Sequence, residues 1–258
     1  MNDRPVNDGP VNARSSHAAL PASLRSTLRP VAGLAALVVV VLGVLYAGAG
    51  VPGRVDRWLV RPTADSVRPP WRTVALALDF LGEPVGAALL LVAVASGCLL
   101  FRRPRSAVLV VVGAALTVGA ATLLKSLVGR TIHGADNLSY PSGHTAFATA
   151  LALTAALLAA GRLGLARAAG TSLVLTAALV AGAAMGWAQV ALGAHYPTDA
   201  LGGWCTALTV VPATAWLIDR TADRSANRSA NRSAGGPADP PDGPVAAPPA
   251  DAGRRERH

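Results

Sequence analysis

The chain has 258 residues, of which 52% are hydrophobic and only 14% are charged. Soluble domains carry about 25% charged residues, so this composition excludes a disordered chain and argues against an ordinary soluble globule. The net charge is +9, but 22 of the 23 basic residues are arginines scattered over loops and tails without a basic stripe, which argues against a nucleic-acid-binding protein. Charge is concentrated in residues 1–30, 54–83 and 219–258. We interpret the chain as an integral membrane protein.

Six apolar runs are long enough, or nearly so, to cross a hydrocarbon core of roughly 30 Å as helices. The predicted spans are residues 31–51, 84–101, 106–128, 145–160, 168–192 and 200–218. Between the first two spans, residues 52–83 interleave charged residues with Trp58 and Trp71, a pattern typical of a segment at the membrane interface. The sequence therefore predicts an all-α fold, a polytopic membrane bundle of six transmembrane helices with an interfacial segment after the first.

The two ends of the chain differ from this bundle in composition. Residues 1–27 are polar with several prolines, and residues 219–258 contain an Asn-Arg-Ser-Ala repeat followed by a stretch rich in Pro, Gly, Ala and Asp. Segments that cannot bury an apolar face remain disordered. We expect disordered tails at 1–27 and 219–258 around a membrane domain at 28–218.

Arginine placement predicts the orientation of the bundle. With both termini in the cytoplasm, 16 of the 23 basic residues lie on the cytoplasmic side and 7 on the outer side. Cytoplasmic loops carry the excess of basic residues in membrane proteins. We therefore expect cytoplasmic tails, and two outward-facing loops at residues 125–144 and 189–199.

These two loops hold three of the five histidines and the single lysine, Lys125. Because the sequence uses arginine for every other cation, a lone lysine suggests a need for a compact ammonium group. The alternative is an interfacial lysine that extends its amine to water.

The segment Pro141-Ser142-Gly143-His144 directly precedes an apolar run and predicts the start of a helix. Serine is a favoured N-cap, and glycine lets a ligand approach the backbone. The free N–H groups of a helix start bind anions, phosphate in particular. A capped helix alone would explain Ser142 and Gly143 but not His144.

His195 and Asp199 are four residues apart, and Pro197 between them suits the first turn of the last span. If that turn brings them together, the carboxylate orients one imidazole nitrogen and leaves the other free as a nucleophile. The alternative is an interfacial histidine beside a capping aspartate.

In order and spacing these residues resemble the type 2 phosphatidic acid phosphatase superfamily, in its small bacterial membrane branch. The signature of that family is Lys, six residues and Arg-Pro; then Pro-Ser-Gly-His; then Ser-Arg, five residues, His, three residues and Asp. Lys125, the unbroken segment 141–144 and the pair His195 and Asp199 all match. The resemblance covers about residues 71–218.

The resemblance implies a phosphoric ester or diphosphate hydrolase of the cell membrane that acts on a lipid or polyprenyl phosphate at the extracytoplasmic face. His195 would attack phosphorus and form a phosphohistidine, Asp199 would orient it, and His144 would protonate the leaving alcohol. Lys125 and the amides of Ser142 and Gly143 would hold the phosphoryl oxygens. The family requires no metal or other cofactor, so the implied partners are the lipid phosphate and membrane lipids, with no oligomeric state specified.

Two arginines of the signature are absent from this chain. Ile132 and His133 stand where the family has Arg-Pro, and Gln189 stands where it has the arginine of Ser-Arg. We expect Arg130, two residues early, to substitute as a substrate-binding cation, helped by a protonated His133 and a hydrogen bond from Gln189.

Three alternatives stay open. The chain could be a phosphotransferase, or a non-catalytic lipid-phosphate-binding protein that lost catalysis with the two arginines. The retention of both histidines and the aspartate favours an enzyme. The third is a zinc site built from His133, Asp136, His144 and His195, which would leave the helix start and the lone lysine unexplained.

Overall fold

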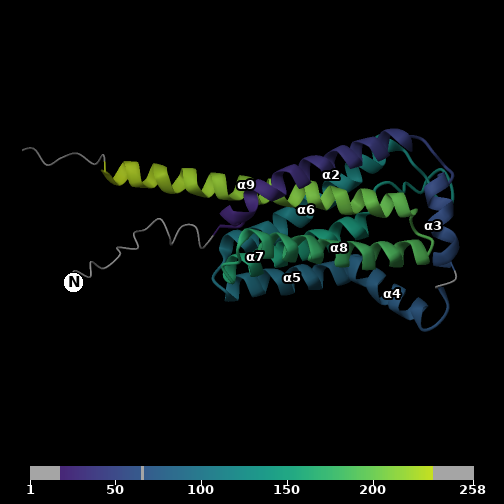
Figure 1. The fold of residues 1–258 in the computed structure, drawn as a ribbon, viewed down its shortest axis with the longest axis horizontal. Helices are drawn as coiled ribbons and strands as arrows, with labels where there is room; N and C mark the ends of the chain where they lie inside the picture. Colours follow the sequence, from purple (N-terminus) through teal and green to yellow (C-terminus); the bar gives the residue numbers. More distant parts are fainter. Residues whose placement is uncertain (1–17, 65–66, 235–258) are drawn as a thin grey trace, which may run out of the picture. The chain divides into compact units, whose positions relative to one another are not determined.

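The computed structural model describes residues 18–64 and 67–234. The elements, in order, are η1(Ala22–Leu24), α2(Arg25–Leu45), α3(Arg54–Ala64), α4(Trp71–Gly82), α5(Pro84–Leu100), α6(Pro104–Val128), α7(Gly143–Arg162), α8(Arg167–Ala191) and α9(Pro197–Ala234). Within these described ranges the β-structure is one isolated bridge between Thr131 and Leu138. The predicted all-α class is confirmed (Figure 1).

Five stretches are long and apolar enough to cross a membrane: Ala22–Leu45, Pro104–Val128, Gly143–Arg162, Arg167–Ala191 and Pro197–Ser229. The helices α4 and α5 pass the same test as a pair bent by 68°, which gives up to six spans. The bend falls at Glu83, whose backbone is extended (φ −68°, ψ 157°). Pro84 disfavours a helical conformation at the preceding residue. The polytopic bundle is therefore as predicted, and residues 71–82, expected at the interface, form the helix α4, which is joined to α5 by this bend.

The first span begins earlier than predicted, at Arg25, and ends earlier, at Leu45. Ala19, Leu20 and Leu24 are buried against the bundle. The amides of Ala19 and Leu20 donate to the carboxylate of Asp219, at 2.8 and 3.0 Å. Residues 18–27, expected in the tail, are thus part of the bundle because a buried carboxylate takes up their backbone donors. The remainder of that predicted tail, residues 1–17, lies outside the described residues.

The last helix also extends beyond the predicted boundary. The chain divides into two compact units, Met1–Arg220 and Thr221–His258, and α9 continues into the second as far as Ala234. There Ser225 and Ser229 donate to backbone carbonyls four residues earlier. Alanine and arginine are good helix formers, which accounts for a helical repeat without an apolar face. Residues 235–258 lie outside the described residues.

Within the first unit, α7 packs between α6 and α8. Among the candidate spans of the described residues, α7 is the most buried, with 61% of its apolar stretch buried against 22% for the first span. Large apolar side chains on α2, such as Leu34, Leu37 and Val44, are exposed, as expected of a surface that faces lipid. The helix α3 lies across one end of the bundle (Figure 1) and contacts α8.

Candidate active site

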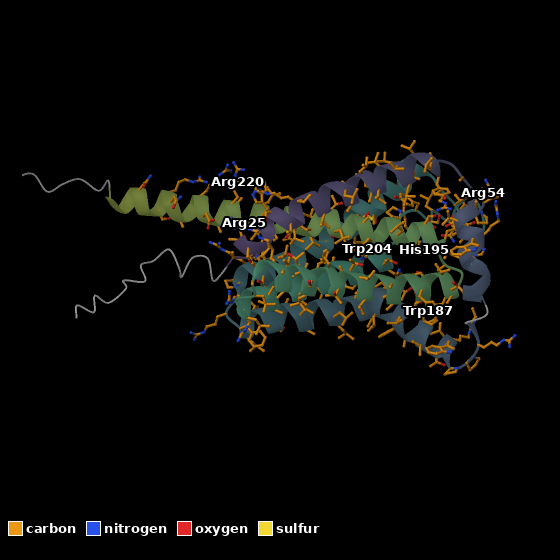
Figure 2. All side chains as sticks on the ribbon, viewed as in Figure 1. Arg25, Arg54, Trp187, His195, Trp204 and Arg220 are labelled. Atoms are coloured by element: carbon orange, nitrogen blue, oxygen red, sulfur yellow. The ribbon has the colours of Figure 1, made fainter. Side chains whose placement is uncertain are left out.

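The predicted site residues gather at one end of the first unit. Figure 2 shows His195 at the same end as Arg54 of α3, while Arg25 lies at the opposite end. The loop between α6 and α7 and the loop between α8 and α9 meet there, where the amide of Ser142 donates to the carbonyl of Asp199 at 2.9 Å. This bond joins the Pro-Ser-Gly-His segment to the His–Asp pair.

Asp199 lies in the first turn of α9 and faces His195, as the spacing predicted. His195 Nδ1 lies 3.8 Å from Asp199 Oδ2, and the Asp199 side chain is fully buried. The same oxygen accepts the amide of Tyr196 at 3.0 Å. His195 itself is 8% exposed. Because Nδ1 faces the carboxylate, Nε2 is the ring nitrogen left to react.

Several charges act on His195. Burial is the largest influence and lowers the pKa of His195 below the ordinary value of histidine; Asp199 opposes that shift, and positive charge on Lys125 and His144 adds to it. Lys125 lies half-buried in the last turn of α6. The ring is consequently neutral, and able to act as a nucleophile, at lower pH than an ordinary histidine.

The Pro-Ser-Gly-His segment starts α7 as predicted. Ser142 is the N-cap, and its Oγ accepts the amide and the hydroxyl of Thr145. The amides at a helix start have no carbonyl partner within the helix. Since the Ser142 amide is taken up by Asp199 and that of Thr145 by Ser142, the donors left for an anion are those of Gly143 and His144. The space beside the Gly143 Cα is open.

Close packing from α2 and α9 fixes this segment in place. Tyr140 is fully buried, and its hydroxyl donates to the carbonyl of Val39 in α2 at 2.8 Å. A side chain at Gly202 would collide with the Tyr140 ring, and one at Gly203 with the carbonyl of Ser142. The two glycines therefore let α9 approach the segment closely enough for Asp199 to reach it.

His144 faces two carboxylates, Asp79 and Glu83, that belong to none of the sequence motifs. Its Nε2 lies 3.6 Å from Asp79 Oδ1 and 3.6 Å from Glu83 Oε1. A side chain at Gly82 would collide with the His144 ring, so a glycine is required at the bend between α4 and α5. The signal available in the sequence was a pair of carboxylates four residues apart within an apolar stretch.

Gln189 contacts the same carboxylate cluster. It is 1% exposed, and its Nε2 donates to Asp79 Oδ1 at 2.7 Å. Its amide nitrogen is therefore engaged with Asp79, and the role in substrate binding expected of Gln189 stays a prediction.

Among the described residues, the group with suitable spacing for a metal ion is Asp79, Glu83 and His144, whose ligand atoms lie within 4.8 Å of one another. It shares only His144 with the zinc set considered from the sequence.

Arg130 lies in a different environment from the one its predicted role requires. Its side chain is fully buried, and its guanidinium donates to Asp199, Asp56 and Thr198. The rings of Tyr46 and Tyr196 lie 4.0 and 4.5 Å from its Cζ. This placement does not favour contact with a phosphoryl group, because the side chain is fully buried and both terminal nitrogens are bound to carboxylates, which leaves only Nε without a partner.

His133, the other expected helper, lies exposed in the loop before α7. Its Nε2 is 2.8 Å from the carbonyl of Gly193, in the loop before α9. It therefore bridges the two loops. The structure thus brings together His195, Asp199, His144 and Lys125, with Arg130 buried behind Asp199.

Comparisons with known proteins identify the family and the fold. A family model described as the PAP2 superfamily matches residues 85–222, more than half of the chain. A solved structure, described as the crystal structure of the first transmembrane PAP2-type phosphatidylglycerolphosphate phosphatase from Bacillus subtilis, is similar in fold. It has a TM-score of 0.56 at 19% identity and covers 75% of this chain and 96% of its own. A comparison with curated protein sequences gives no match. The chain belongs to the PAP2 superfamily, a superfamily of phosphatases, and is a membrane-embedded member of it.

Proposed function

We propose that this protein hydrolyses a lipid or polyprenyl phosphate or diphosphate at the extracytoplasmic face of the cell membrane through a phosphohistidine on His195. The observation that carries the proposal is the convergence of Lys125, His144 and the His195–Asp199 pair at one end of the bundle. A nucleophile, an acid, an orienting carboxylate and a cation are the set that phosphoryl transfer needs.

The first half of the reaction forms the covalent intermediate. Nε2 of His195 attacks phosphorus, an N–P bond forms and the P–O bond to the lipid alcohol breaks. The leaving oxygen takes a proton from His144. Lys125 and the amides of Gly143 and His144 bind the phosphoryl oxygens, where charge accumulates in the transition state.

The second half releases inorganic phosphate. Water attacks the phosphohistidine, a P–O bond forms, the N–P bond breaks and the water proton passes to His144. Asp199 stabilises the His195 ring in the orientation that both halves share. No step requires a metal ion.

The substrate class follows from the surroundings of the site. The site lies where the apolar spans end, so a substrate anchored in the membrane reaches it with its headgroup. Phosphatidate-like lipids, polyprenyl carriers and phosphatidylglycerol phosphate, on which the Bacillus subtilis protein is named to act, share a phosphate at the end of an apolar anchor. With Ile132 and Gln189 in place of two arginines, the site has less positive charge than the family signature implies, which favours a monophosphate over a diphosphate.

The proposed orientation has both termini in the cytoplasm. Figure 2 supports it in that Arg25 and Arg220 lie at the end opposite His195, and basic residues accumulate on the cytoplasmic side. Cysteines introduced at Asn137 and Arg162, in a background without Cys98 and Cys205, should differ in reactivity in intact cells. An impermeant thiol reagent should label the first and not the second; the reverse pattern contradicts the orientation.

Phosphate release by the purified full chain tests the activity. The probes are phosphatidate, phosphatidylglycerol phosphate and undecaprenyl phosphate in phosphatidylcholine vesicles, with the His195→Ala variant alongside. The proposal predicts release by the wild type from at least one probe and none by the variant. Binding of a probe without release by the wild type would instead support the non-catalytic alternative.

A further inference from the structure

We propose that Asp56 and Arg130 are positioning residues, which fix the carboxylate of Asp199 and through it the ring of His195. The inference rests on the function proposed above. It assigns a role to a residue of the interfacial helix α3 that no signature of the family includes, and it replaces the substrate-binding role expected of Arg130.

Arg130 bridges two buried carboxylates. Its Nη2 lies 2.6 Å from Asp56 Oδ2 and its Nη1 lies 2.6 Å from Asp199 Oδ1; all three side chains are fully buried. Charge-assisted bonds of this length are among the stronger hydrogen bonds in proteins. The rings of Tyr46 and Tyr196 lie against the guanidinium. Arg130 is therefore held through both of its terminal nitrogens and by two tyrosine rings, while its Nε has no hydrogen-bond partner.

Asp56 uses its two oxygens to fasten the start of α9. Oδ1 accepts the amide of Thr198 at 3.0 Å and its hydroxyl at 2.8 Å, while Oδ2 accepts the amide of Gly53 at 3.0 Å in addition to Arg130. Burial alone would raise the pKa of Asp56, but the hydrogen bonds from Thr198, Arg130 and Gly53 outweigh it, so its pKa is lowered and it is charged. An aspartate 142 residues away in sequence thus caps the helix that carries Asp199.

The two oxygens of Asp199 have separate tasks as a result. Oδ1 is bound by Arg130, and Oδ2 faces the Tyr196 amide and His195 Nδ1. Arg130 forms ion pairs with both Asp56 and Asp199, so its positive charge is divided between two carboxylates. The orientation of the Asp199 carboxylate toward the imidazole is therefore fixed before the substrate binds.

Arg130 is not available to a phosphoryl group as an exposed cation. Its side chain is fully buried, and a phosphoryl oxygen at either terminal nitrogen would have to displace Asp199 or Asp56 from a bond of 2.6 Å. The guanidinium therefore acts on the reaction through Asp199, and its loss should affect turnover and not substrate binding.

The test compares kcat and KM of four full-length variants, Asp56→Asn, Arg130→Gln, Asp199→Asn and the double variant Asp56→Asn/Asp199→Asn. The substrate is whichever of the three vesicle probes the wild type hydrolyses fastest. Loss of a residue that holds a catalytic group costs about tenfold to a hundredfold. We expect Asp56→Asn and Arg130→Gln each to lower kcat by that factor, with KM unchanged within about twofold.

The double variant separates a positioning role from a merely structural one. If Asp56 acts through Asp199, removing it from a chain that already lacks the Asp199 carboxylate should cost less than about threefold. Additive losses, or a wild-type kcat in Asp56→Asn, would overturn the inference. A raised KM with unchanged kcat in Arg130→Gln would restore its substrate-binding role.

Two further variants keep the test decisive. Thr198→Val removes the hydroxyl that links Arg130 and Asp56 while preserving shape, and it takes the place of Asp56→Asn if that variant does not fold. We expect Thr198→Val to lower kcat several-fold; a wild-type kcat in this variant overturns the inference. Asp219→Asn, a buried carboxylate with two arginine neighbours far from His195, is the control and should keep its kcat. The His195→Ala variant tests the proposed function separately. Activity that survives in this variant would show that the reaction does not pass through His195, the residue on which Asp56 is proposed to act.

Discussion

Two buried carboxylates, Asp199 and Asp219, bracket the apolar run 200–218 of α9, and its two ends differ in what surrounds these carboxylates. Asp199 binds Arg130 and the Tyr196 amide and faces His195. Asp219 binds the amides of Ala19 and Leu20, and its described ion pairs are with Arg25 and Arg105, at 3.5 Å each.

The two carboxylates show that a buried ion pair is not in itself a mark of function. Asp219 fastens the segment before α2 to the bundle, which is a structural task. Asp199 has the same chemistry but lies beside a histidine with one ring nitrogen left to react. Burial and charge are common to both ends, and the neighbouring titratable group distinguishes them.

The largest expected effect is the loss of phosphate release when His195, beside Asp199, is replaced. His195→Ala should reduce phosphate release by many orders of magnitude, because the covalent step disappears. The melting temperature of this variant, measured in the same vesicles, should stay close to that of the wild type. Wild-type-like turnover would mean that another group attacks phosphorus.

Asp199→Asn should cause the second-largest loss of kcat. The amide cannot stabilise the charged ring, and a triad aspartate replaced in this way costs about 10⁴-fold in kcat in a well-studied protease; we expect a loss of that order or somewhat less. Asp219→Asn is the matched comparison. Equal losses of kcat in both variants would show that the two ends do not differ as described.

His144→Ala should lower kcat by about a hundredfold to ten-thousandfold, the range of general acid catalysis. The loss should be larger for esters with poor leaving groups, since these need the proton most. Aryl phosphates and lipid phosphates measured side by side provide this contrast. An equal loss for both kinds of ester would argue that His144 binds phosphate and does not donate a proton.

The pH dependence of kcat/KM should reflect the shift at His195. Its pKa is lowered by burial, so the neutral, nucleophilic ring persists as pH falls, and the acid limb should lie below the ordinary histidine value of about 6.5. Asp199 opposes that shift, so Asp199→Asn should move the acid limb to still lower pH in its residual activity. Movement to higher pH would contradict the assigned charge balance.

Asp219→Asn should have its effect on stability. Leaving buried donors without a charged acceptor costs about 1–3 kcal/mol in the free energy of unfolding, with kcat unchanged for the folded fraction. Denaturation in detergent, monitored by helical circular dichroism, measures the stability, and phosphate release measures kcat.

A chelator should change neither the stability nor the kcat of the wild type. A loss of activity that is restored by added divalent cation would instead indicate a metal ion at Asp79, Glu83 and His144.

Local patterns were sufficient to predict much of the molecule. Runs of apolar residues predicted the spans, and Pro-Ser-Gly-His predicted a capped start to α7, because these features depend on neighbours within one or two helical turns. The spacing of His195 and Asp199 predicted their approach for the same reason.

Features that depend on distant partners were not predicted. Asp56 and Arg130 are 74 residues apart, and neither has a local signal that would pair them, so Arg130 was expected at the substrate. The bend at Glu83 aligns α4 with His144, and the buried position of Ala19 and Leu20 depends on Asp219, 200 and 199 residues away. Such contacts arise from the packing of whole helices.

The central claim is that His195, which lies just before α9, carries the phosphoryl group during turnover. Vesicles containing the full chain are incubated with a lipid phosphate labelled at phosphorus, and the reaction is stopped with alkaline detergent, in which phosphohistidine survives. Peptide mapping should find the label on the peptide containing His195, at reduced stoichiometry in Asp199→Asn and unchanged stoichiometry in Asp219→Asn. Label on any other residue, or steady phosphate release by a protein that never becomes labelled, would contradict the account.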